Sequence, residues 1–127
     1  MLLRRTVLLG LLGLAGLLGF SAPAGAATLY TAPLSFQVPF GQDLECKVVN
    51  VAKSPTTVRV RAISDDGTTT NDSGDVVLAP LESFALGANV LADRHFCRFD
   101  VNGGKRRVRA GACTVGANGC RAVLPAQ

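Results

Sequence analysis

Short segments in which apolar and polar residues alternate recur along most of this chain. They are rich in β-branched or aromatic residues and are separated by Pro, Gly, Asn or Asp, which is the pattern of β-strands joined by turns. Strands are expected over 34–40, 43–51, 56–63, 75–79, 82–88, 95–101 and 106–112. About seven strands at this spacing predict one all-β antiparallel sandwich. The segment 84–92 leaves a helical turn open as an alternative, although Gly87 interrupts its apolar stripe.

The alternation also assigns a face to each side chain, because successive residues of a strand point to opposite sides of a sheet. Within 56–63, Val58 and Val60 share one side, and Arg59 and Arg61 share the other. The apolar side is expected to face the core.

The segment VNGGKR, residues 101–106, predicts a tight hairpin between the last two expected strands. A four-residue loop there places every core position of one strand against an apolar position of the other. The predicted pairs are Phe99 with Val108, Cys97 with Ala110, Asp100 with Arg107 and Arg98 with Arg109.

The first 26 residues have the three parts of a secretory signal peptide. Arg4 and Arg5 give a basic start, residues 6–20 are uncharged and almost wholly apolar, and small residues precede a cleavage site after Ala26. The alternative is a membrane anchor, but spanning a bilayer takes about 20 apolar residues. We therefore expect a mature domain over 27–127, exported to a periplasm or outside the cell, with no transmembrane anchor after cleavage.

All four cysteines follow the predicted signal peptide, so two disulfides are expected in an oxidising compartment. Four cysteines allow three pairings. We favour Cys46 with Cys97, because both occupy core-facing positions of long strands, and Cys113 with Cys120, because they flank the turn-forming segment TVGANG. The alternative is a zinc site, but the chain has no CxxC motif and one histidine, so no metal or cofactor is predicted.

Two cysteines about fifty residues apart, with sandwich spacing between them, resemble an immunoglobulin-like domain over residues 30–112. The chain has no Trp, and His95 stands where that family has its tyrosine corner. More closely, several segments are similar to a group of small, uncharacterised, exported bacterial proteins: LYTAPL, LECKVVNVAKSPTTVRVRAI, VVLAPLES, HFCRFDV, KRRVRAGA and LPAQ. This resemblance implies an envelope or extracellular location and no particular chemistry.

Catalytic residues are not indicated. His95 is the sole histidine, and no Ser or Cys stands beside it in a triad-like arrangement. The aspartates of SDDGTTTNDSGD, residues 64–75, offer the oxygen ligands that Ca²⁺ prefers, but they lack the ordered spacing of a calcium-binding loop. We therefore predict a polar inter-strand loop at 64–75 and a protein that is not an enzyme.

Basic residues gather towards the C-terminus. The mature part carries a net charge of +2, divided into −3 over 27–97 and +5 from Arg98 onwards. With the hairpin assigned above, Arg98, Arg107 and Arg109 are expected on one sheet face. Arg59 and Arg61 join them if the strand 56–63 neighbours the hairpin, as in an immunoglobulin-like sheet, which gives a face of five arginines.

Arginine binds phosphate, sulfate and carboxylate groups with two parallel hydrogen bonds. The predicted function is therefore a non-catalytic binding module that recognises an anionic surface polymer, such as a glycan or another envelope component. Two alternatives remain open. The arginines can simply solvate the sheet, and the domain can instead be a structural or protein-interaction domain without an anionic ligand, such as an adhesin-like subunit or an inhibitor that uses the loop 113–120.

Overall fold

The computed structural model describes residues 25–35, 42–90, 94–116 and 119–127. The predicted signal peptide lies outside these ranges except for Gly25 and Ala26, and residues 36–40 of the first expected strand and Asn118 of the predicted turn also lie outside. No helix in the described ranges is long and apolar enough to cross a membrane.

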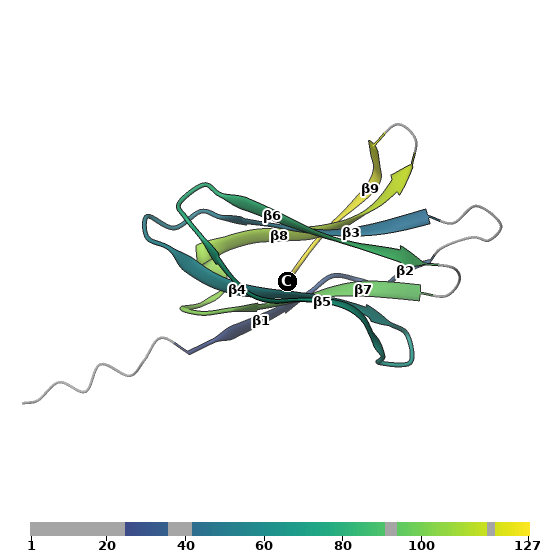
Figure 1. The fold of residues 1–127 in the computed structure, drawn as a ribbon, viewed down its shortest axis with the longest axis horizontal. Helices are drawn as coiled ribbons and strands as arrows, with labels where there is room; N and C mark the ends of the chain where they lie inside the picture. The colour runs from purple at the N-terminus through teal and green to yellow at the C-terminus, as the bar shows by residue number, and fades with distance from the viewer. Residues whose placement is uncertain (1–24, 36–41, 91–93, 117–118) are drawn as a thin grey trace, which may run out of the picture.

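The described residues form two antiparallel sheets that pack face to face (Figure 1). Sheet A has the order β1-β7-β4-β5, with β2 also paired to β7, and sheet B has the order β6-β3-β8-β9. The elements are β1 (Ala27–Tyr30), β2 (Leu34–Ser35), β3 (Gln42–Asn50), β4 (Thr56–Ser64), β5 (Thr69–Leu78), β6 (Ser83–Val90), β7 (Arg94–Val101), the 3-10 helix η1 (Lys105–Arg107), β8 (Val108–Gly116) and β9 (Gly119–Pro125). The predicted all-β antiparallel sandwich is confirmed.

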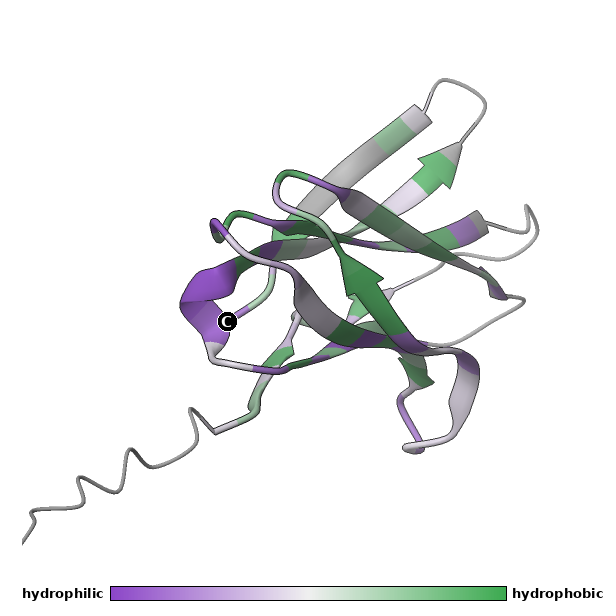
Figure 2. Cartoon of the chain, turned by 60° about the vertical axis from the view of Figure 1, so that its left-hand side comes forward, coloured by the Kyte–Doolittle hydropathy of each residue, from purple (hydrophilic) through white to green (hydrophobic). Residues whose placement is uncertain are grey.

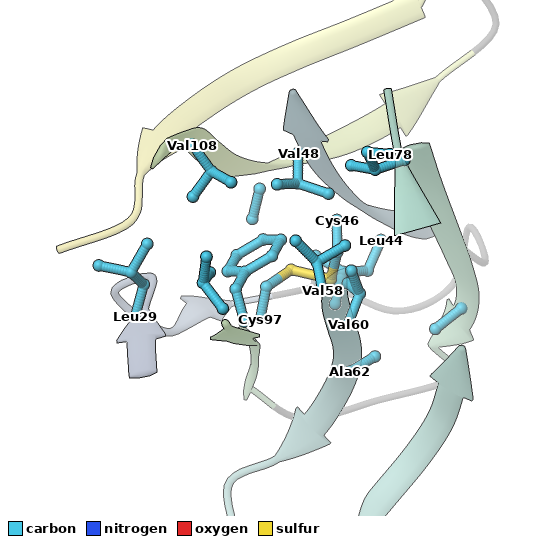
Figure 3. Close-up of a cluster of buried hydrophobic side chains, with 14 residues drawn as sticks. Leu29, Leu44, Cys46, Val48, Val58, Val60, Ala62, Leu78, Cys97 and Val108 are labelled. Carbon is cyan, nitrogen blue, oxygen red and sulfur yellow. A yellow bond between two sulfur atoms is a disulfide. The ribbon is translucent and has the colours of Figure 1, made fainter. Parts of the chain in front are cut away.

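The core lies between the sheets and follows the alternation of the strands. In β4 and β7 every second residue is buried, including Val58, Val60 and Phe99, each with no exposed surface. Cys46 of β3 and Cys97 of β7 are also fully buried, and they form a disulfide that crosses from one sheet to the other (Figure 3). The predicted pairing of these two cysteines, on core-facing positions, is confirmed.

The predicted hairpin between β7 and β8 was wrong, because the two strands belong to different sheets. Phe99 lies opposite Val60 on one side and Leu29 on the other, instead of opposite Val108. The alternation of apolar and polar residues in β7 is compatible with any neighbouring strand that has an apolar core-facing side. The alternation therefore cannot identify which strand pairs with β7. The connection between the strands contains Gly103 and Gly104, both with positive φ, and η1, which together cross from sheet A to sheet B.

Two further expectations on secondary structure were wrong: residues 69–75 belong to β5 instead of a loop, and β1 and β9 were not expected. The expected strand over 82–88 is confirmed as β6, so the alternative of a helical turn does not apply to residues 84–90. The first half of β5 is an exposed edge strand of polar residues, so it lacks an apolar face. An irregularity in its pairing with β4 lies at Ser73 and Gly74, where the Ser73 hydroxyl accepts a hydrogen bond from Val60 N at 2.8 Å.

The second disulfide joins Cys113 of β8 to Cys120 of β9, and this predicted pairing is also confirmed. β9 lies so close to β8 that a Cβ atom at Gly111 would come within 2.7 Å of the Leu124 carbonyl oxygen. Beyond β9, Ala126 N donates to Ala110 O, and Gln127 exchanges two backbone hydrogen bonds with Tyr30 of β1. The C-terminal residues thus connect the two sheets along one side. Together, the two disulfides indicate an oxidising environment.

The two disulfides are expected to stabilise the fold unequally. On the chain-entropy account, removing the bridge between Cys46 and Cys97, which are 51 residues apart, costs about 4 kcal/mol, and removing the bridge between Cys113 and Cys120, 7 residues apart, costs about 2.5 kcal/mol. Denaturant unfolding of the two double Cys→Ala variants measures the difference. An equal or larger cost for the Cys113–Cys120 bridge would contradict this order.

Candidate functional site

Three of the five predicted arginines meet on the outer face of sheet A, where each one contacts a carboxylate. Arg59 of β4 binds Asp72 of β5, with 2.6 Å between Nη2 and Oδ2. Arg61 pairs with Asp100 of β7, and Arg98 Nη2 lies 3.1 Å from the same carboxylate. The positive charge on this face is therefore largely compensated from within the chain.

The carboxylates on this face are held in their charged form. Hydrogen bonds from Arg59 and from the backbone N–H of Gly74 lower the pKa of Asp72 to about 2. Burial raises the pKa of Asp100, but hydrogen bonds from Arg61, Thr28 and Arg98 outweigh burial and leave that pKa below its usual value. The hydrogen bond to Asp72 raises the pKa of Arg59 further. These shifts describe ion pairs that are formed inside the protein.

Two aromatic rings lie at the border of this arginine group. The Arg98 guanidinium is 5.8 Å from the centre of the Tyr30 ring, and the Phe96 ring is 6.2 Å from the same ring. Arg98 is thus engaged by both a carboxylate and an aromatic face.

Arg107 and Arg109 lie elsewhere, so the predicted five-arginine face does not form. Arg107 reaches across to the start of β4 and the connection before it, where its guanidinium donates to Thr56 Oγ1 at 2.9 Å and to Ser54 Oγ at 2.6 Å. Its side chain also passes Gly103 so closely that a Cβ atom there would come within 2.7 Å of Arg107 Cδ. Arg107 therefore fastens two connections together, and its position follows from the crossing of the chain between the sheets.

Three connections meet at one end of the sandwich: 51–55 between β3 and β4, 79–82 between β5 and β6, and 102–107 between β7 and β8 (Figure 1, left). We call these segments, together with Val108 and Arg109, the cationic end. They contain one carboxylate, that of Glu82, and five basic side chains, from Lys53, Lys105, Arg106, Arg107 and Arg109. In Figure 2 the deep purple coil at the left is η1, which supplies three of them.

The cations of this end differ from those of sheet A in having no carboxylate partner. Within the described ranges, no ion pair involves any of the five, and the Glu82 carboxylate accepts a hydrogen bond from Ala79 N at 2.7 Å. Lys105, Arg106 and Arg109 line one hollow of about 500 Å³. Its walls include the apolar residues Leu29, Val108, Ala110 and Ala126. The hollow is therefore lined by both basic and apolar residues, and Gln127 borders it as well.

Asn50, at the end of β3, holds two of these connections, 51–55 and 79–82, in place. Its fully buried side chain donates to Ser54 O and Leu78 O, both at 2.9 Å, and accepts from Ala52 N at 2.9 Å and from Thr56 Oγ1 at 3.1 Å. Its backbone exchanges hydrogen bonds with the turn 79–82. Every donor and acceptor of the amide is used, so this one side chain sets the geometry of the end.

Leu81 is the one residue other than glycine with a positive φ, 64°, in the described part of the chain. It follows Pro80 in a turn closed by a hydrogen bond from Glu82 N to Ala79 O at 3.0 Å. The third position of such a turn favours Gly or Asn, because a left-handed backbone costs a residue such as Leu about 1–2 kcal/mol. The Leu81 side chain is 79% exposed and gains little burial in return.

The other groups that could serve in catalysis or metal binding are His95, the aspartates of 64–75 and a cluster around Glu45. His95, in β7, is buried with 5% of its surface exposed. The Asp66 carboxylate accepts hydrogen bonds from Ser64 Oγ and Thr68 N, which lower its pKa to about 2. Glu45, Cys113 and Cys120 lie within 4.8 Å of one another, the spacing of a metal site, but the two sulfur atoms are bonded to each other.

A second hollow, of about 470 Å³, lies on the outer face of sheet B and is almost wholly apolar. It is bordered by the Cys113–Cys120 disulfide, Pro125 and Gly111, and by the basic side chains of Lys47 and Arg109. Lys47 forms an ion pair with Glu45, with 2.7 Å between Nζ and Oε1. Arg109 lines both hollows.

Comparison with known proteins supports the fold alone. No family model and no curated protein matches the chain. The crystal structure of Thermotoga maritima 1070 is similar, with a TM-score of 0.55 over 81% of this chain and 94% of that chain. The two sequences are 14% identical, so the similarity shows a shared two-sheet sandwich and nothing about ligands.

The Arg59–Asp72 pair is expected to make the free energy of unfolding depend on pH in the acidic range. The Asp72 pKa falls from its usual 3.8 to about 2 on folding, so its contribution is complete above pH 4 and is lost as the pH drops towards 2. Since the pair is partly exposed, this contribution is at most about 1 kcal/mol. Unfolding free energies between pH 5 and pH 2 should decline less in Asp72→Asn than in wild type. Asp65→Asn, an exposed control, should follow wild type; equal slopes in all three chains would refute the expectation.

Asn50→Ala is expected to destabilise the chain by about 3 kcal/mol, because it leaves buried backbone groups without partners. Denaturant unfolding measures the change. Asn89→Ala removes an exposed amide from β6 and should stay within about 0.5 kcal/mol of wild type. Similar stabilities of the two variants would show that Asn50 does not hold the connections together.

Proposed function

We propose that this chain is an exported, non-catalytic binding module that recognises an anionic polymer or surface of the cell envelope through its cationic end. One observation supports the proposal above the others. Lys105, Arg106 and Arg109 line a single hollow, and none of them forms an ion pair with a carboxylate of the described residues.

The arginines on sheet A suit this role less well. Binding an external anion there would require Arg59, Arg61 or Arg98 to release Asp72 or Asp100, whose pKa values are already lowered by these contacts. A group that must first break an internal ion pair gains little from forming an external one. Lys105 and Arg106 of η1 have no such partner to release among the described residues.

The donors at the cationic end suit phosphate, sulfate or carboxylate groups. An Arg guanidinium binds such a group with two parallel hydrogen bonds, and a Lys ammonium adds a compact positive charge. Arg107, held by Thr56 and Ser54, fixes the course of the chain directly after Lys105 and Arg106. The two free cations therefore project from an anchored segment, which limits the entropy lost on binding.

Retention of the oxidised protein on immobilised heparin, a sulfated polymer, tests the proposal. Wild type should bind with an affinity that falls as salt increases, because binding releases counterions. In Lys105→Gln/Arg106→Gln, the slope of log affinity against log salt should decrease by about 2, one unit for each cation removed.

Arg59→Gln/Arg98→Gln is the matched control, because it removes the same net charge from the paired face. It should keep the wild-type slope. Equal losses in both double variants would mean that only net charge matters, and absence of retention in wild type at low salt would overturn the proposal.

A further inference from the structure

The cationic end also exposes apolar side chains, and the most exposed one occupies a strained position. Leu81 is 79% exposed, the highest value among the large apolar side chains that the structure exposes. It adopts a positive φ that Gly or Asn would adopt at lower cost. A residue that strains the backbone and also presents an apolar side chain to water is a candidate for function.

Val51 extends this apolar surface towards the cations. It is 40% exposed and follows Asn50, whose carbonyl oxygen accepts a hydrogen bond from Leu81 N at 2.8 Å. Val51 N donates in turn to Arg107 O at 2.8 Å. Leu81, Val51 and η1 thus lie in connections next to the ends of β6, β3 and β8, which are neighbours in sheet B.

Apolar side chains beside unpaired cations fit the surface of an anionic bilayer. Acyl chains accept the apolar groups, while lipid phosphates lie at the level of the cations. A sulfated or phosphorylated polymer dissolved in water uses the cations but gives Leu81 no apolar surface. The composition of this end therefore distinguishes between two kinds of anionic partner.

We propose that the cationic end docks on an anionic lipid bilayer, with Leu81 and Val51 entering the interface and Lys53, Lys105 and Arg106 contacting lipid phosphates. This inference rests on the proposed function and specifies its partner. Arg107 holds the connection that carries Lys53, because its guanidinium donates to Ser54 Oγ and Pro55 O. The Glu82 carboxylate, engaged with Ala79 N, is the one acidic group of this end.

Co-sedimentation with large unilamellar vesicles tests the inference. One set contains phosphatidylglycerol mixed with phosphatidylcholine, and the other contains phosphatidylcholine alone. The full oxidised chain should bind the anionic vesicles preferentially, and Leu81→Asn should weaken that binding about tenfold. Since Asn tolerates a positive φ, this variant should fold at least as well as wild type, which a rise in thermal midpoint would show.

Two controls separate insertion from charge and from loss of structure. Tyr30→Ser removes an exposed aromatic side chain from the outer face of sheet A, away from the cationic end, and should leave vesicle binding unchanged. Leu81→Asn should leave heparin retention unchanged, because it removes no charge, whereas Lys105→Gln/Arg106→Gln should weaken binding to both heparin and vesicles.

The outcomes are distinguishable. If wild type is retained on heparin but does not bind anionic vesicles, the bilayer inference fails and the proposed function stands. If Leu81→Asn binds vesicles like wild type, insertion of Leu81 is refuted. If wild type binds neither heparin nor vesicles, both proposals fail.

Discussion

The packing of the two sheets depends on one contact in the middle of the core, the disulfide between Cys46 and Cys97. β3 and β7 each lie between two other strands of their own sheet, so the bridge joins the interiors of the sheets instead of their edges. Phe99 and Leu44, two of the three largest fully buried side chains, lie on the same two strands. The disulfide and the burial of large apolar side chains therefore stabilise the same central part of the core. The outer strands of each sheet pack around this centre.

Two groups of basic residues in one small chain have opposite relations to their surroundings. Arg59, Arg61 and Arg98 lie across strands that also carry aspartates, so the sheet itself supplies their partners. The cations of η1 arise where the chain passes from one sheet to the other, away from any such strand. A count of net charge does not distinguish these two groups of cations. Pairing within the fold is what separates cations that stabilise the protein from cations that are available to a ligand.

Much of this fold was predictable from alternation, and the rest depended on information that alternation does not carry. The core faces of β3, β4 and β7 and both cysteine pairings followed from residue patterns. The neighbour of β7 did not, because Val60 and Val108 are equally apolar and satisfy the same pattern. The predicted arginine face inherited that error, and with it Arg107 and Arg109 were misplaced. At the candidate site, the Pro80-Leu81 pair was a readable turn signal, whereas the role of Asn50 emerges only when the segments 50–56 and 78–82 meet.

The order of strands in the sheets also has a kinetic consequence. Apart from the β4–β5 and β8–β9 pairs, neighbouring strands are distant in sequence, as when Leu29 pairs with Phe99. The chain must close long loops before most of its sheet contacts can form, and loop closure loses entropy before those contacts compensate for it. Such a topology folds slowly for its size and exposes unpaired strand edges for longer. Oxidation of Cys46 and Cys97 joins two of these distant strands covalently, so a bridge formed before collapse shortens the loops that the chain still has to close.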